Sequence, residues 1–226
     1  LGFSNEYSKD MILEKRSKFH GMEVKVKDIP YGIHQKTMTL YNYTKMMDNH
    51  DYVNIGGQFP WYIFQGHLVP GQSESPSSLV PYELMPTPTV IQEAFKFPKE
   101  DEIIPSTNSK SVFKDKKSRE VFYTAQFSYG VRGSGAAVHF HKFAWNVLLY
   151  GKKEWILYTP HDSLNSNQHV LEFYRNEIDD SKVKRCVQYP GDIVIVPEAW
   201  AHGALNVQDS VAIATEVKRD LWGIRF

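Results

Sequence analysis

The sequence is almost without cysteine, since Cys186 is the only one among 226 residues. A single cysteine excludes an internal disulfide and a metal cluster held by cysteines. No apolar run reaches the roughly 20 residues that a membrane-spanning helix requires, so we expect no membrane span. The 26 basic and 26 acidic residues cancel, so the chain has no global field to attract nucleic acid. The compartment stays open, because Asn42 begins a formal glycosylation sequon.

Proline is concentrated in residues 69–109, which contain seven. This density excludes long regular elements there, apart from a short helix near residues 89–95. The stretch is typical of a wrapping connection, so we expect a single domain over residues 1–226. Its expected parts are an N-terminal elaboration with mixed helices and strands (1–110), a core (111–218) and a short tail (219–226).

Short β runs separated by Gly and Pro turns fill the second half of the chain. Eight such runs are typical of a double-sheet jelly roll. The expected fold class is therefore mainly β (α+β), a double-stranded β-helix with N-terminal helical and strand decorations. The predicted core strands are 121–129, 136–141, 145–150, 154–158, 186–189, 192–196, 201–206 and 211–217. The predicted decorations are a helix at 44–51 and strands at 23–29 and 60–64.

Two histidines, His139 and His141, lie one residue apart in a predicted strand. Side chains alternate along a strand, so both should face the same side. Two imidazoles inside a barrel are costly unless they share a metal or hydrogen-bond partners. Alone, the pair is better explained by surface or core histidines than by a metal site. A third ligand comes from His202, which opens a later strand that can pair beside the first, so the three histidines are the predicted metal ligands.

Residues 143–160 form a predicted hairpin around Gly151, and Lys153 follows its turn. Facing inward, Lys153 could neutralise a bound carboxylate. On spacing alone, the simpler interpretation is that Lys152 and Lys153 are turn cations. Strand 192–196, which precedes the strand of His202, is expected to be buried.

Together these segments resemble the JmjC family of 2-oxoglutarate oxygenases, in the cupin superfamily, over roughly residues 120–217. The similarity rests on residues 133–135, 145–155 and 190–206. The His-aromatic-His spacing is similar to the JmjC domain-containing protein 8 group, and the Trp-Asn hairpin to the lysyl-hydroxylase branch. The resemblance implies Fe(II) and 2-oxoglutarate as cofactors and a protein or peptide as substrate.

Carried over by position, His139 and His202 match the two histidine ligands of the family. Lys153 matches the lysine that binds the distal carboxylate of 2-oxoglutarate. The other positions that match the cosubstrate pocket or its surroundings are Asn146, Asn206 and Trp200.

Two positions depart from the family. His141 stands where most active members carry Asp or Glu, and three neutral imidazoles prefer softer metals. Ala136 stands where the lysyl-hydroxylase branch has a threonine, and losing its hydrogen bond to 2-oxoglutarate costs roughly 1–2 kcal/mol. The first hypothesis is an Fe(II)- and 2-oxoglutarate-dependent protein hydroxylase. The alternative is a catalytically impaired, metal-stabilised binding module. A small-molecule cupin enzyme without 2-oxoglutarate is a third possibility, which gives Lys153 no role.

Several remaining residues are expected to be structural. Cys186 is predicted to lie in the core, and Asp192 to hydrogen-bond within its Pro-Gly turn. Some JmjC enzymes dimerise through a helical extension, and only nine residues follow the last predicted strand here, so we expect a monomer. The other histidines are predicted to be structural or exposed: His20, His34, His50, His67, His161 and His169.

Overall fold

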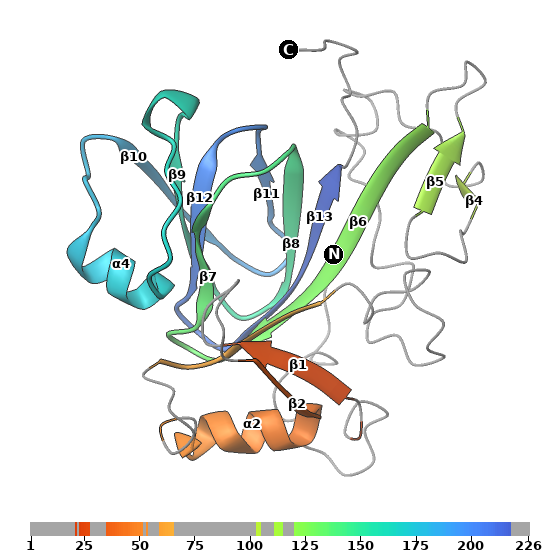
Figure 1. The fold of residues 1–226 in the computed structure, drawn as a ribbon, viewed down its shortest axis with the longest axis vertical. Helices are drawn as coiled ribbons and strands as arrows, with labels where there is room; N and C mark the ends of the chain where they lie inside the picture. The colour runs from red at the N-terminus through yellow and green to blue at the C-terminus, as the bar shows by residue number, and fades with distance from the viewer. Residues whose placement is uncertain are drawn as a thin grey trace.

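The structure, a computed structural model, confirms the mainly β jelly roll (Figure 1). The predicted helix near 89–95 lies outside the described residues, and the division of the chain at residues 110 and 218 stays a prediction. Among the described residues, no helix is long and apolar enough to cross a membrane. The described residues are 21, 23–27, 35–51, 53, 59–65, 103–104, 111–114 and 120–217.

The described strands form two antiparallel sheets. The larger runs β11-β8-β13-β6-β3-β1-β2, with β5 also paired with β6 and β4 paired with β5, and the smaller runs β10-β9-β12-β7. All eight predicted core strands are present: β6 (Glu120–Gly130), β7 (Gly135–His139), β8 (Ala144–Tyr150), β9 (Lys153–Tyr158), β10 (Val183–Gln188), β11 (Ile193–Val196), β12 (Ala201–Asn206) and β13 (Ser210–Val217). The others are β1 (Glu23–Lys27), β2 (Gln35–Thr39), β3 (Tyr62–Gln65), β4 (Ile103–Ile104) and β5 (Ser111–Lys114).

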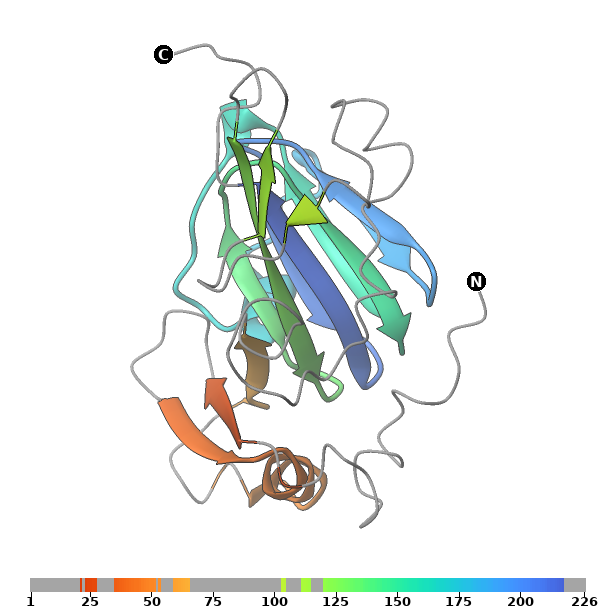
Figure 2. The same cartoon turned by 90° about the vertical axis from the view of Figure 1, so that its right-hand side faces the viewer.

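The N-terminal decorations extend the larger sheet and gather at one end of the jelly roll (Figures 1 and 2). Helix α2 (Leu40–Asp48) begins four residues earlier than predicted, because the Thr39 side chain accepts a hydrogen bond from the Asn42 amide and caps it. Tyr43 of this helix meets Tyr129 of β6 edge-on at 5.5 Å between ring centroids. This packing covers part of the larger sheet's outer face and leaves its inner face toward the smaller sheet.

A second helix, α4 (Val170–Asn176), was missed from the sequence. The buried His169 caps it, with Nδ1 accepting from the Leu171 amide at 3.2 Å. The same ring stacks on Phe59, with 4.4 Å between ring centroids. Histidine is not among the residues that usually begin a helix, so the start carried no recognisable signal. The structural role predicted for His169 is confirmed.

Two burial predictions at the sheet edges are wrong. Cys186 is exposed rather than in the core. In β11, Ile193 and Ile195 are 41% and 40% exposed, so this strand is not buried on both faces. The reason is topological, because among the described strands β10 and β11 are the end strands of their sheets, each with a neighbour on one side only.

Gln188 ties the two sheets together where β10 leads into β11. Its side chain accepts a hydrogen bond from Trp155 Nε1 at 2.8 Å. Its amide nitrogen donates to the Asn146 carbonyl at 2.9 Å and to the Asp192 carbonyl at 3.1 Å. Because Gln188 is only 1% exposed, these three partners replace the water that it loses on folding. Asp192 bonds the Tyr189 amide through its own side chain, as predicted for a turn residue.

Replacing Gln188 with leucine should lower the free energy of unfolding by about 1–3 kcal/mol, because the Trp155 N–H loses its acceptor and the Asn146 and Asp192 carbonyls lose the side-chain donor. Urea denaturation measures the loss. Gln208→Leu, at an exposed position, is the matched control and should change stability by less than about 0.5 kcal/mol. Equal stability of both variants would contradict this account of the junction.

Candidate functional site

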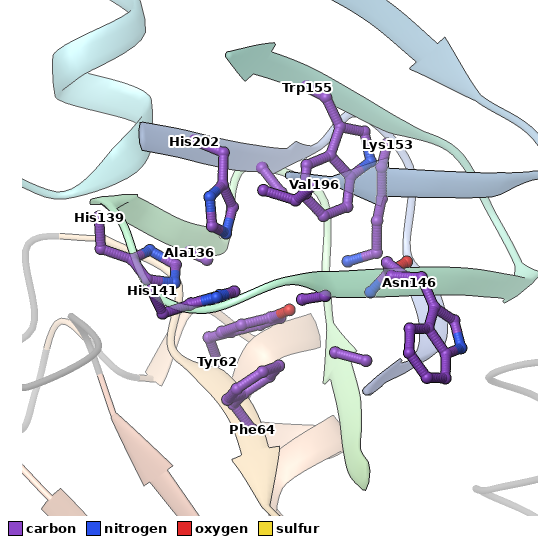
Figure 3. Close-up of a pocket in the computed structure, with 14 residues that line it drawn as sticks. Tyr62, Phe64, Ala136, His139, His141, Asn146, Lys153, Trp155, Val196 and His202 are labelled. Carbon is purple, nitrogen blue, oxygen red and sulfur yellow. The ribbon is translucent and has the colours of Figure 1, made fainter. Parts of the chain in front are cut away.

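His139, His141 and His202 converge between the sheets (Figure 3). His139 ends β7 and stands opposite His202 of β12 in the antiparallel register. The ring centroids lie 4.4 Å apart for these two, and 5.2 Å and 4.7 Å from His141. One ligand nitrogen from each residue lies within 4.8 Å of the other two. The three predicted ligands are therefore brought together in a geometry that could hold a metal ion.

A bulge in β7 shapes this face of the site. His202 pairs with His139, but Ala204 pairs with Ala136, so three steps along β7 match two along β12. The additional residue turns both Ala136 and His139 to the cavity, which strict alternation would not allow. β7 then ends, and His141 lies beyond it rather than within a strand as predicted.

A neighbouring turn, 197–200, holds His141 in place. The Ala199 amide donates to the His141 carbonyl at 3.1 Å, and the Ala199 carbonyl accepts from Ser163 Oγ at 2.9 Å. Ala199 adopts a left-handed backbone with φ of +63°, which is strained for a residue other than glycine. Lys142 and Glu198 form an ion pair between the same two segments. The turn before β12 therefore fixes His141 close to His202.

All three imidazoles have the same tautomer. Each Nδ1 lies within hydrogen-bonding distance of a backbone carbonyl, which can only accept, so each Nδ1 carries the proton and each Nε2 keeps its lone pair. Metal-binding histidines are held in this way. The carbonyl partners in chain order belong to Ala137, Lys142 and Trp200, at 2.8, 2.6 and 3.1 Å.

The site favours uncharged imidazoles. Burial lowers the pKa of His139, and the neighbouring His141 lowers it further. Burial also holds the pKa of His202 well below its usual range, helped by repulsion from the other two rings. Neutral imidazole is the form that binds a metal, so the site is prepared for a cation rather than for protons.

Lys153 lies in the same cavity and is completely buried, so the interpretation as a turn cation is wrong for it. Its Nζ donates to Asn206 Oδ1 at 2.7 Å and sits 5.4 Å from the centroid of the Tyr62 ring. Burial lowers the pKa of Lys153 to about 7. The turn before it is tight, because Gly151 has a φ of +86° and a Cβ there would overlap the Asp209 carbonyl.

The cavity contains about 440 Å³ of empty space, part of it open to solvent. None of the described lining residues is Asp or Glu. Asn146 lines it, and its buried Oδ1 has no hydrogen-bond partner in the described part of the chain. Asn206 and Trp200, both predicted around the cosubstrate, are not among the described lining residues. The lining residues are Tyr62, Phe64, Ala136, His139, His141, Ala144, Trp145, Asn146, Lys153, Trp155, Val196, His202, Ala204 and Ala214.

Four aromatic residues that line the cavity were not predicted as site residues: Tyr62, Phe64, Trp145 and Trp155. Tyr62 and Phe64 reach it from β3, which pairs with β6 in the larger sheet. The aromatic strand was recognised, but its position in the sheet was not. Trp155 lies along the His202 ring, with 6.1 Å between centroids and 27° between planes. Trp155 follows Lys153 by two residues in the same strand, so both side chains face the same side. This spacing could have placed Trp155 in the cavity from the sequence, given an inward-facing Lys153.

Comparison with known proteins gives a match to one family and to several relatives. Residues 126–217 match the family described as "JmjC domain, hydroxylase". JmjC domain-containing protein 8 of Mus musculus is 30% identical over 100 residues, which cover 41% of this chain and 37% of that protein. Lysine-specific demethylase JMJ21 of Arabidopsis thaliana is 31% identical over 121 residues, covering 44% and 13%. The 2-oxoglutarate and iron-dependent oxygenase JMJD4 of Mus musculus is 27% identical over 101 residues, covering 37% and 24%.

One divalent ion should bind per chain. His202→Ala should lower the affinity for this ion by more than the roughly 10–100-fold that losing an outer-shell partner costs. Equilibrium dialysis with Zn(II), followed by metal analysis, measures the affinity. His161→Ala, at an exposed position outside the cavity, is the control and should bind like the parent protein. A His202→Ala variant with full affinity would place the metal elsewhere.

Proposed function

Residues 126–217 of this chain form a JmjC domain, and on that premise we propose that the protein is an Fe(II)- and 2-oxoglutarate-dependent oxygenase that hydroxylates a side chain of a protein or peptide. The observation that carries the proposal is one cavity with two complementary sites. Three imidazole nitrogens within 4.8 Å of one another suit a divalent metal, and the Nε2 atoms are the ones left free to bind it, because each Nδ1 faces a backbone carbonyl. A buried lysine with no carboxylate among the described lining residues suits the far end of a dicarboxylate.

The donor set fits a metal that must keep open positions. Three imidazoles on one side would leave the remaining positions for cosubstrate and oxygen. When bound, iron with 2-oxoglutarate and O₂ supplies the oxidation, in which one oxygen atom enters a substrate C–H bond and the other ends in succinate as CO₂ leaves. The backbone carbonyls on Nδ1 hold the three rings in the orientation that this requires.

The rest of the cavity fits the dicarboxylate. A carboxylate beside Lys153 would supply the counter-charge that the buried ammonium lacks and form a charge-assisted hydrogen bond. The side-chain amide of Asn146 has an unpaired buried oxygen, and rotation about its last bond presents the NH₂ group instead. A ligand oxygen in the cavity would accept from that group. Tyr62, whose pKa burial raises to about 12, stays protonated and uncharged beside the ammonium.

Exposed aromatic residues favour a protein or peptide substrate. Phe64 lines the cavity and is 38% exposed, so it stands at the opening. Phe140, between two of the proposed metal ligands, is 47% exposed. Both offer apolar contact to a chain that reaches the metal from outside.

A binding module without turnover is the second candidate. His141 replaces the carboxylate that would lower the charge of a metal complex, and Ala136 lines the cavity without a hydroxyl to donate to 2-oxoglutarate. The third hypothesis, a small-molecule enzyme without 2-oxoglutarate, leaves the buried Lys153 without a function.

Turnover distinguishes the two main candidates. The Fe(II)-loaded protein should convert 2-oxoglutarate to succinate in the presence of O₂, measured by mass spectrometry, and His202→Ala should abolish the conversion. If Fe(II) binds but no 2-oxoglutarate binds or is consumed, the oxygenase proposal fails and the binding module remains.

Binding of 2-oxoglutarate should depend on pH through Lys153. Below pH 7 the ammonium is present before binding, so the Kd should be flat. Above pH 7 binding must take up a proton, and the Kd should rise up to about tenfold per pH unit. Anaerobic calorimetry measures it. Lys153→Met should lose this dependence and most of the affinity, whereas Lys152→Met, the partly buried neighbour, should retain both. A Kd independent of pH between 6 and 9 would count against the assignment.

A further inference from the structure

Asn206 is fully buried, and both polar atoms of its side chain are engaged. Oδ1 accepts from Lys153 Nζ at 2.7 Å, and Nδ2 donates to Ser134 Oγ at 3.0 Å. Lys153 and Asn206 are direct partners in the β9–β12 register, so their side chains share one face. Asn206 is not among the described residues that line the cavity, so its amide serves Lys153 and Ser134 rather than a ligand there.

Ser134 determines which end of the amide faces the lysine. Its Oγ donates to the Val131 carbonyl at 2.6 Å, and the single hydroxyl proton is used there. The hydroxyl can therefore only accept from Asn206, which turns Nδ2 toward Ser134 and Oδ1 toward Lys153. With the amide reversed, an NH₂ group would meet the ammonium, and two donors would face each other without an acceptor.

The backbone holds this chain of hydrogen bonds rigidly. The Asn206 amide donates to the Ser134 carbonyl, and the Gly133 amide donates to the Asn206 carbonyl, each at 2.8 Å. Space is so limited that a Cβ on Gly130 would overlap Ser134 Oγ, Asn206 Nδ2 and the Tyr62 ring. Neither Ser134 nor Asn206 is exposed to solvent, so no water competes for these bonds.

We propose that Ser134 and Asn206 are positioning residues that hold the Lys153 ammonium ready for an anionic ligand, and that neither contacts that ligand. The inference rests on the proposed function, in which Lys153 receives the distal carboxylate of 2-oxoglutarate. A lysine has a flexible stem and three rotatable donors. One donor directed to Asn206 fixes the ammonium, so less side-chain freedom is lost when the carboxylate arrives.

Ser134→Ala tests the far end of the hydrogen-bonded chain Ser134–Asn206–Lys153, called the relay below, and leaves the lysine itself unchanged. It should raise the Kd of the Fe(II)-loaded protein for 2-oxoglutarate about tenfold, the size of one hydrogen bond to a charged group, in anaerobic calorimetry. The affinity for Fe(II) should not change. Ser210→Ala is the matched control, because Ser210 is also fully buried but bonds only to the backbone of residues 152 and 208. It should bind 2-oxoglutarate like the parent protein.

A second measurement reads Lys153 in the ligand-free protein. The ¹³Cε signal of Lys153, assigned by its loss in Lys153→Met, should titrate at lower pH in Ser134→Ala because the ammonium loses its ordered acceptor. In Asn206→Asp it should titrate at least about one unit higher, because a carboxylate stabilises the charge. That variant should also bind 2-oxoglutarate more weakly, since the lysine is already paired.

The two measurements separate this inference from the proposed function. If the parent protein does not bind 2-oxoglutarate but Ser134→Ala shifts the Lys153 midpoint, the relay stands and the cosubstrate assignment fails. If Ser134→Ala leaves both the Kd and the midpoint at parental values, the relay is overturned.

Discussion

Strands β7 and β12 pair so that His139 and His202 stand directly opposite each other, and the rest of the site is arranged around that pair. A slip of one residue would turn one of the two histidines to the other face of the smaller sheet. The same strand β12 also pairs with β9, which places Lys153 opposite Asn206. One central strand therefore positions both the proposed metal ligands and the lysine proposed to bind the anion.

The chemistry of the cavity follows from the charges that this arrangement buries. Its titratable lining groups among the described residues are three imidazoles, a lysine and a tyrosine, none of them acidic at neutral pH. Burial lowers the pKa values of His139 and His202, which favours their uncharged forms. It also lowers the pKa of Lys153 to about 7, so this side chain is only partly charged at neutral pH. A cation at the imidazoles and a dianion reaching the lysine would attract each other, so binding of either would raise the affinity of the cavity for the other. In the proposed metal site, His141 would leave the metal complex more positive than a carboxylate would, and this would increase the demand for an anionic ligand.

Much of this could be predicted from the sequence, because it follows from local pattern. The strand period and the Gly and Pro turns predict the jelly roll, and the spacing of His139, His141 and His202 predicts their convergence. The direction of Lys153 could not be decided from spacing, because it depends on the register of β9 with β12. Tyr62 reaches the cavity only through the pairing of β3 with β6. The exposure of Cys186 depends on β10 being an edge strand, which is a property of the whole sheet.

The central claim is that three Nε2 atoms bind one metal ion between the sheets. X-ray absorption of the protein loaded with one equivalent of Zn(II) tests it most directly. The account predicts a first shell with three imidazole nitrogens at about 2.0–2.1 Å and no protein sulfur, reduced to two imidazoles in His141→Ala. A shell of fewer imidazoles in the parent protein, or one that His141→Ala leaves unchanged, would contradict it.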